Sequence, residues 1–142
     1  MIGKTIEELR VGERAEFSKT MTETDVYLYA GVTGDFNPAH INEEYAKRTH
    51  FKTRIVHGML LAGLISGVLG CRLPGPGTVY IRQDMRFLAP VHVGDTITAT
   101  VEILEVMTET ERIKVRTVCA NQEGAIVLDG EAIVSPPRRS KS

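Results

Sequence analysis

Cysteine, net charge and long apolar runs are all scarce in this sequence, and each shortage excludes a class of protein. The 142 residues contain two cysteines, Cys71 and Cys119, in no CxxC pair and no metal-spaced cluster. We interpret both as small buried residues of a protein in a reducing compartment, the cytoplasm. A net charge of −1 gives no electrostatic reason to expect nucleic acid or an anionic membrane as a partner.

We also expect neither a membrane-spanning segment nor a targeting signal. The longest apolar stretch, residues 59–68, is interrupted by glycine and serine and is far shorter than the roughly 20 residues of a spanning helix. The charged first residues contain no apolar h-region, so we expect no signal peptide. We therefore expect one domain over 1–142, with a frayed basic tail at 136–142.

The first half of the chain has helical and irregular patterns. Thr22, with Asp25 three residues further on, predicts a capped helix that Gly34 ends. A proline within 35–41 predicts irregular backbone there, and a short helix over 42–48 follows.

Residues 57–71 predict a longer helix that is apolar nearly all round and therefore buried on most of its faces. Its glycines at 63, 67 and 70 cost helix propensity, and we expect them to allow close approach of a sheet or a ligand.

The second half of the chain alternates apolar and polar residues, the mark of strands with one buried face. The predicted strands cover 79–87, 95–106, 111–120 and 125–134, and a weaker one covers 14–21. One apolar helix followed by four successive strands indicates an α+β fold with the helix covered by an antiparallel sheet. Such a sheet has edges that need protection, so we expect a homodimer.

Asp35 and His40 are the first candidates for chemistry. On a loop bent by a proline, a carboxylate and an imidazole can converge on one water, remove a proton from it and deliver one. The structural alternative is that Asp35 caps a turn and His40 has no catalytic role.

The start of the long helix is the second candidate. N–H groups at a helix N-terminus are unpaired, and Gly58 has no side chain to block a carbonyl oxygen, so this position suits an oxyanion hole. The alternative is that Gly58 only starts the helix. Ser66 lies about two turns further on and is either structural or part of a pocket, because its flanks do not form a nucleophile elbow. The spacing of Asp35, His40 and His57 matches no common zinc pattern, so we expect no metal and no other cofactor.

Three segments carry a resemblance to a known family. GDFNPAHI at 34–41 resembles the hydratase-2 motif of MaoC-like dehydratases, and IVHGML at 55–60 resembles that family's second signature. FLAPVHVGD at 87–95 resembles the third. The signatures come in family order at family spacing, and the likeness runs from about residue 11 to residue 134.

The resemblance implies a hot-dog fold, in which two copies pair their sheets. It implies that Asp35 and His40 are the catalytic pair, that the Gly58 amide is the oxyanion donor, and that Asn37, His57 and Ser66 contact substrate. The implied activity is that of an R-specific enoyl-CoA hydratase, a hydro-lyase that adds water to trans-2-enoyl-CoA, as in polyhydroxyalkanoate synthesis or fatty-acid metabolism.

Three other functions remain open at this point. A dehydratase acting on acyl carrier protein would use the same residues. A non-catalytic acyl-thioester binding module would not need both Asp35 and His40, and a hot-dog thioesterase would release free thiol. Arginines and lysines at 48, 52, 54, 82 and 86 could meet either CoA phosphates or a carrier protein.

Overall fold

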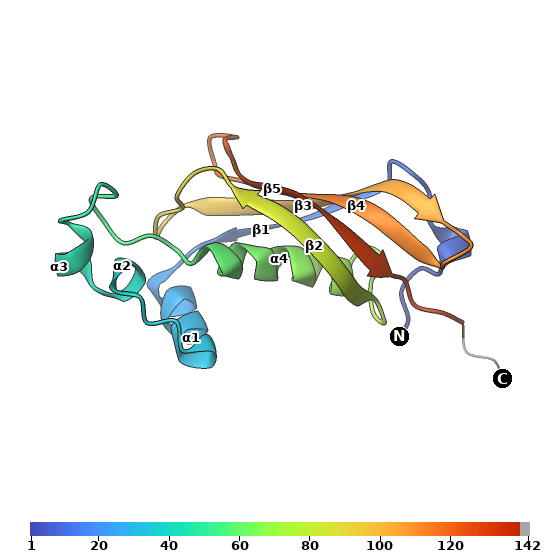
Figure 1. The fold of residues 1–142 in the computed structure, drawn as a ribbon, viewed down its shortest axis with the longest axis horizontal. Coiled ribbons are helices and arrows are strands. Elements are labelled where there is room, and N and C mark those ends of the chain that lie inside the picture. Colours follow the sequence, from blue (N-terminus) through green and yellow to red (C-terminus); the bar gives the residue numbers. More distant parts are fainter. Residues whose placement is uncertain (140–142) are drawn as a thin grey trace.

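A five-stranded antiparallel sheet with one long helix along its face dominates the computed structural model, which describes residues 1–139 (Figure 1). The strand order is β1-β3-β4-β5-β2, so β1 and β2 form the two edges. The strands are β1 (Arg14–Thr20), β2 (Val79–Phe87), β3 (Thr96–Met107), β4 (Arg112–Ala120) and β5 (Ile126–Ser135). The helices are the 3-10 turn η1 (Ile6–Glu8), α1 (Glu23–Thr33), α2 (Pro38–Ile41), α3 (Glu43–Ala46) and α4 (Gly58–Cys71).

The hydrophobic core lies between the sheet and α4. Alternate residues of β3, from Ile97 to Ile103, are fully buried, and the polar residues between them are not. They face the helix side chains Leu61 and Ile65, which are also buried. The period of two in the sequence therefore produced the expected strands, and the α+β fold with a helix covered by an antiparallel sheet is confirmed.

Only one side of α4 is buried, which corrects the prediction of a helix buried on most faces. Leu61, Ile65 and Leu69 face the sheet, whereas Met59 is 53% exposed. A Cβ atom added at glycine 63, 67 or 70 would meet nothing within 4 Å, so these glycines are not required for packing against this chain's sheet. The open side of α4 consists of Met59, Gly63, Ser66 and Gly67.

The predicted boundaries of α1 are confirmed. The Thr22 hydroxyl accepts a hydrogen bond from the Asp25 N–H, and the Asp25 carboxylate accepts one from the Thr22 N–H at 2.9 Å. At the other end Gly34 adopts φ 79°, a left-handed conformation that glycine reaches without strain. The chain is thereby turned so that residue 35 leaves the helix axis.

Helices α1, α2 and α3 lie together beyond one end of the sheet (Figure 1). The prediction of irregular backbone over 35–41 is wrong for its second half, because Pro38 begins a single helical turn. A proline is well suited to the first position of a helix, where its missing N–H would have no partner. The next helix, with Asn42 as its cap, is shorter than predicted and ends at Ala46.

Two further predictions need correction. Cys119 is buried as expected, but Cys71 is exposed at the end of α4. The tail was expected to fray from Pro136, yet Pro136 and Pro137 are buried, and the Pro137 Cβ lies 2.8 Å from where a Cβ on Gly77 would be. The rest of the predicted tail, 140–142, lies outside the described residues. Among residues 1–139, no helix is both long and apolar enough to cross a membrane.

Candidate active site

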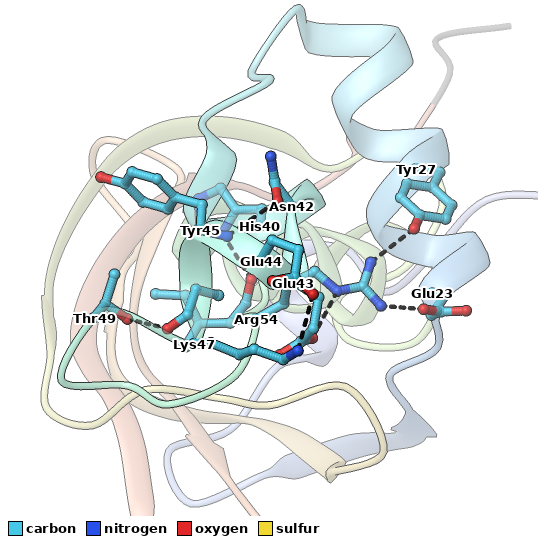
Figure 2. Close-up of polar contacts among 12 residues, drawn as sticks. Glu23, Tyr27, His40, Asn42, Glu43, Glu44, Tyr45, Lys47, Thr49 and Arg54 are labelled. Atoms are coloured by element: carbon cyan, nitrogen blue, oxygen red, sulfur yellow. Dashed lines mark hydrogen bonds and ion pairs between the residues drawn. The ribbon is translucent and has the colours of Figure 1, made fainter.

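A buried arginine joins α1 to α3. Arg54 is 9% exposed and lies between α1 and α3. Its guanidinium donates to the Tyr27 hydroxyl at 2.7 Å, to Glu43 at 3.2 Å and to the Glu23 carboxylate (Figure 2). Because the guanidinium already donates to these three partners, Arg54 is not free to bind a CoA phosphate. The sequence had suggested that it could. We call Arg54 and its three partners the Arg54 clamp.

His40 projects from α2, the helix between the clamped elements. It is 9% exposed, and its Nδ1 lies 2.7 Å from the Ile55 carbonyl oxygen (Figure 2). A carbonyl oxygen only accepts, so Nδ1 carries the hydrogen and Nε2 of the neutral ring carries the lone pair. The Ile55 N–H donates in return to the Ala39 carbonyl at 3.1 Å. These two bonds fix α2 to the segment that leads into α4.

Asp35 lies on the exposed turn between α1 and α2. Its Oδ1 accepts a hydrogen bond from the Asn37 N–H at 3.3 Å. The Asn37 side chain in turn caps α2, because its Oδ1 accepts from the Ala39 N–H at 3.1 Å. The structure thus gives Asn37 a local structural role and leaves its predicted substrate contact as a prediction.

His57 connects this turn to the start of α4. The ring is 1% exposed, and its Nε2 donates to the backbone carbonyl of Asp35 at 3.0 Å. It stacks on the His40 ring with a centroid distance of 3.9 Å, and the Tyr29 ring lies 4.6 Å away on centroids. Burial lowers the pKa of His57 below 6.5, and the charge that His40 can carry adds to this, while the Asp35 carbonyl acts in the opposite direction.

Asp35, His40 and His57 each offer one potential ligand atom, and these atoms lie within 4.8 Å of one another. One nitrogen of each histidine is already engaged by a backbone carbonyl. A zinc ion would need the remaining nitrogens and a carboxylate oxygen at about 2.0–2.2 Å. The Asp35 carboxylate and the free His40 nitrogen are equally suited to accept the two hydrogen bonds of a water molecule. The expected absence of a metal therefore stays a prediction.

A cavity of about 520 Å³ opens beside these residues, a size typical of small-ligand sites. Asp35, His40, His57 and Gly58 line it, and the rest of its wall is largely apolar. The other lining residues are Phe51, Ile55, Val56, Met59, Leu61, Phe87, Leu88, Ala89, Pro90 and Val91. Three charged or polar side chains therefore line a largely apolar cavity beside Gly58, the first residue of a 14-residue helix.

Gly58 packs closely against the Phe87 ring as well as lining the cavity. A Cβ atom at this position would lie 2.7 Å from the Phe87 ring, closer than real contacts allow. The Gly58 N–H is among the first of α4, which have no partner within the helix and carry partial positive charge. The geometry therefore suits an oxyanion hole.

The structure thus brings together four of the six site residues predicted from the sequence. Within residues 1–139, the wall of the cavity does not include Asn37 or Ser66. Ser66 is exposed on the open side of α4, so its substrate contact remains a prediction. Phe51, Phe87 and Leu88 were missed, although the last two belong to the third signature segment.

Comparisons with known proteins agree with this geometry. Residues 8–124 match the MaoC like domain. An (R)-specific enoyl-CoA hydratase from Rhodospirillum rubrum is 51% identical over 94% of this chain and 92% of its own length.

Two solved structures are also similar. An unliganded R-hydratase from Pseudomonas aeruginosa has a TM-score of 0.91 and 42% identity over 96% of this chain and 88% of its own. An (R)-hydratase from A. caviae, described as involved in PHA biosynthesis, has a TM-score of 0.90 and 41% identity over 92% of this chain and 99% of its own.

Proposed function

This chain belongs to the MaoC-like domain family, and on that premise we propose that it is an (R)-specific enoyl-CoA hydratase. The observation that carries the proposal is the convergence of the Asp35 carboxylate and the His40 ring in the wall of a largely apolar cavity that Gly58 also lines. The relatives at 41% to 51% identity support the same activity. The reaction is the reversible addition of water to a trans-2-enoyl-CoA, giving an (R)-3-hydroxyacyl-CoA.

In the proposed mechanism, Asp35 and His40 hold one water over the β-carbon of the enoyl thioester. The lone pair on His40 Nε2 and the Asp35 carboxylate both accept hydrogen bonds from this water. As the water oxygen bonds to the β-carbon, one of its protons passes to the pair, and a proton returns from the pair to the α-carbon on the same face. The pair ends in its starting state, and the product carries the elements of one water.

The thioester carbonyl gains negative charge during this step. Gly58 lines the cavity and begins α4, so we propose that its N–H, at the positive end of the helix, donates to that oxygen. The acyl chain lies along the apolar wall, against residues such as Phe87 and Leu88.

The proposal includes a homodimer in the cytoplasm that supplies hydroxyacyl-CoA for polyhydroxyalkanoate or fatty-acid metabolism. The open side of α4 and the edge strand β2 support the dimer, because both expose apolar residues. Val79 and Ile81 on β2 are 57% and 44% exposed. Sedimentation analysis tests it, and a monomer at enzyme-assay concentrations would refute this part alone.

The test of activity uses crotonyl-CoA and follows the ultraviolet absorbance of its conjugated thioester, with a thiol reagent in parallel. We expect loss of absorbance without thiol release and a product of R configuration. Asp35→Asn and His40→Gln should each lower kcat by about 10²- to 10⁴-fold. Glu123→Gln is the control, since Glu123 lies exposed in the turn between β4 and β5 and outside the cavity wall.

Each alternative outcome identifies a different function. Thiol release would indicate a thioesterase. Hydration of an enoyl-acyl carrier protein but of no enoyl-CoA would indicate a carrier-protein dehydratase. Binding of acyl-CoA without turnover would indicate a binding module, and a loss of less than about twofold in both variants would remove Asp35 and His40 from the mechanism.

A further inference from the structure

The side chain of His57 has no part in the mechanism above, yet it contacts both residues that do. Its Nε2 donates to the Asp35 carbonyl at 3.0 Å, across 22 positions of the sequence. Its ring stacks on His40 at 3.9 Å. Its own backbone is the N-cap of α4, so the next residue is Gly58, the oxyanion donor of the proposed mechanism.

The backbone of Asp35 is otherwise held only by its neighbours. Its N–H donates to the Thr33 hydroxyl at 3.2 Å, two residues away. Among the hydrogen bonds that the main chain of Asp35 makes within residues 1–139, only the one from His57 comes from a distant part of the chain. That bond therefore ties the main chain of Asp35 directly to the start of α4.

A purely structural role does not explain a histidine at this position. His57 Nδ1 is buried and has no hydrogen-bond partner within the described residues. An unpaired buried polar atom lowers stability, and a phenylalanine would fill the same space without one. The Nε2–H bond to Asp35 is the feature that a phenylalanine could not supply.

We propose that His57 is a positioning residue that holds Asp35 and His40 in register with the Gly58 N–H. The inference rests on the proposed hydratase function, and it replaces the substrate contact that the resemblance implied for His57 with an action through Asp35 and His40. His57 belongs to the cavity wall, but its 1% exposure leaves almost none of it for a substrate to touch, which agrees with a residue that supports the reacting groups.

Two variants separate the two contacts of His57. His57→Phe keeps a ring on His40 but removes the donor, whereas His57→Gln places an amide N–H near the former Nε2 and removes the ring. His92→Gln is the matched control, because His92 is half-buried and outside the cavity wall. Thermal unfolding of each variant shows that it folds.

We expect His57→Phe to lower kcat about 10- to 100-fold, because small misplacements of reacting groups are costly, and to leave KM within about threefold. His57→Gln should recover most of kcat. In an Asp35→Asn background, His57→Phe should cost little more, since the residue it positions is already disabled.

Three kinetic outcomes would overturn the inference. A raised KM with unchanged kcat would make His57 a substrate contact. A glutamine variant as slow as the phenylalanine variant would show that the Nε2–H bond is irrelevant. Full additivity with Asp35→Asn would show that His57 acts elsewhere.

Amide hydrogen exchange tests the same inference without any substrate. Exchange over residues 34–41 should be faster in His57→Phe than in wild type and in His92→Gln. If wild type hydrates no enoyl thioester, the proposed function fails, while unchanged exchange in His57→Phe would refute the positioning role itself.

Discussion

Replacing Arg54 with methionine should destabilise the protein and slow the enzyme together. The guanidinium is 9% exposed and donates to Glu23, Tyr27 and Glu43. Methionine keeps most of the apolar stem and removes only the donors. These bonds join α1 to α3, and α2 with His40 lies between them (Figure 1).

The magnitude follows from the exposure of the acceptors. A hydrogen bond to a charged group contributes about 1.5–3 kcal/mol when buried, but an exposed ion pair contributes about 0.2–1 kcal/mol. The side chains of Glu23 and Glu43 are 56% and 42% exposed, so water replaces the lost arginine in part. The total loss should therefore be about 2 kcal/mol, which lowers Tm by roughly 4–8 °C in a domain of this size.

Circular dichroism during thermal unfolding measures this loss, with all variants at one protein concentration. Arg14→Met is the control, because Arg14 is 62% exposed and pairs with Glu102 at 3.6 Å on the sheet. It should change stability by less than about 0.5 kcal/mol. Arg54→Lys should be intermediate, since an ammonium cannot reproduce the planar fork.

Activity should fall with stability, because the clamp orients α2 and therefore His40. We expect kcat of Arg54→Met to decrease by about tenfold well below its Tm. An Arg54→Met protein no less stable than Arg14→Met, or one with full kcat, would refute the view that the clamp holds the site together. A double-mutant cycle with Glu23→Gln should give a coupling of about 0.5–1 kcal/mol.

Three more predictions concern single positions. Gly31→Ala should stabilise the protein by about 0.5–1 kcal/mol, because a Cβ at this position in α1 meets open space. Gly34→Ala should destabilise it by about 1 kcal/mol, because residue 34 has a φ of 79°. Chemical denaturation measures both free energies of unfolding, and a change in the same direction for both variants would contradict this. Burial lowers the pKa of His57 below 6.5, so the unfolded chain binds a proton that the native chain resists. The contribution of His57 to stability is complete above about pH 6.5 and is lost as pH falls below that value. The Tm of His57→Gln should therefore depend less on pH in this range, and an unchanged Tm profile would contradict the assignment to His57. A thiol reagent should react with the exposed Cys71 in the native protein but with Cys119 only in denaturant, because burial raises the pKa of Cys119 to about 12. Rapid reaction of both cysteines in the native protein would contradict the fold.

Features that depend on neighbours in the chain could be predicted without the structure. The capping box at Thr22, the left-handed Gly34 and the strands of period two involve contacts within a few residues, so the residue types reveal them. The motif residues Asp35 and His40, together with Gly58, were likewise identifiable, and the structure places all three in the wall of one cavity.

Even local inference failed where two rules competed. Pro38 was taken to exclude a helix over 35–41, but a proline excludes only the interior of a helix and favours its first position. The apolar residues of α4 were taken to require burial on most faces of the helix. Within one chain the sheet covers a single side, and Met59 stays exposed.

By itself the sequence determined the elements, the α+β class and the residues that carry a motif, because hydrophobic periodicity and capping are short-range effects. Only the tertiary structure decided which distant groups meet. Arg54 reaches Glu23 across 31 positions, and His57 reaches Asp35 across 22, and neither spacing follows a period that the chain displays. Such contacts arise when whole elements pack, so the support of the active site became visible only in the folded protein.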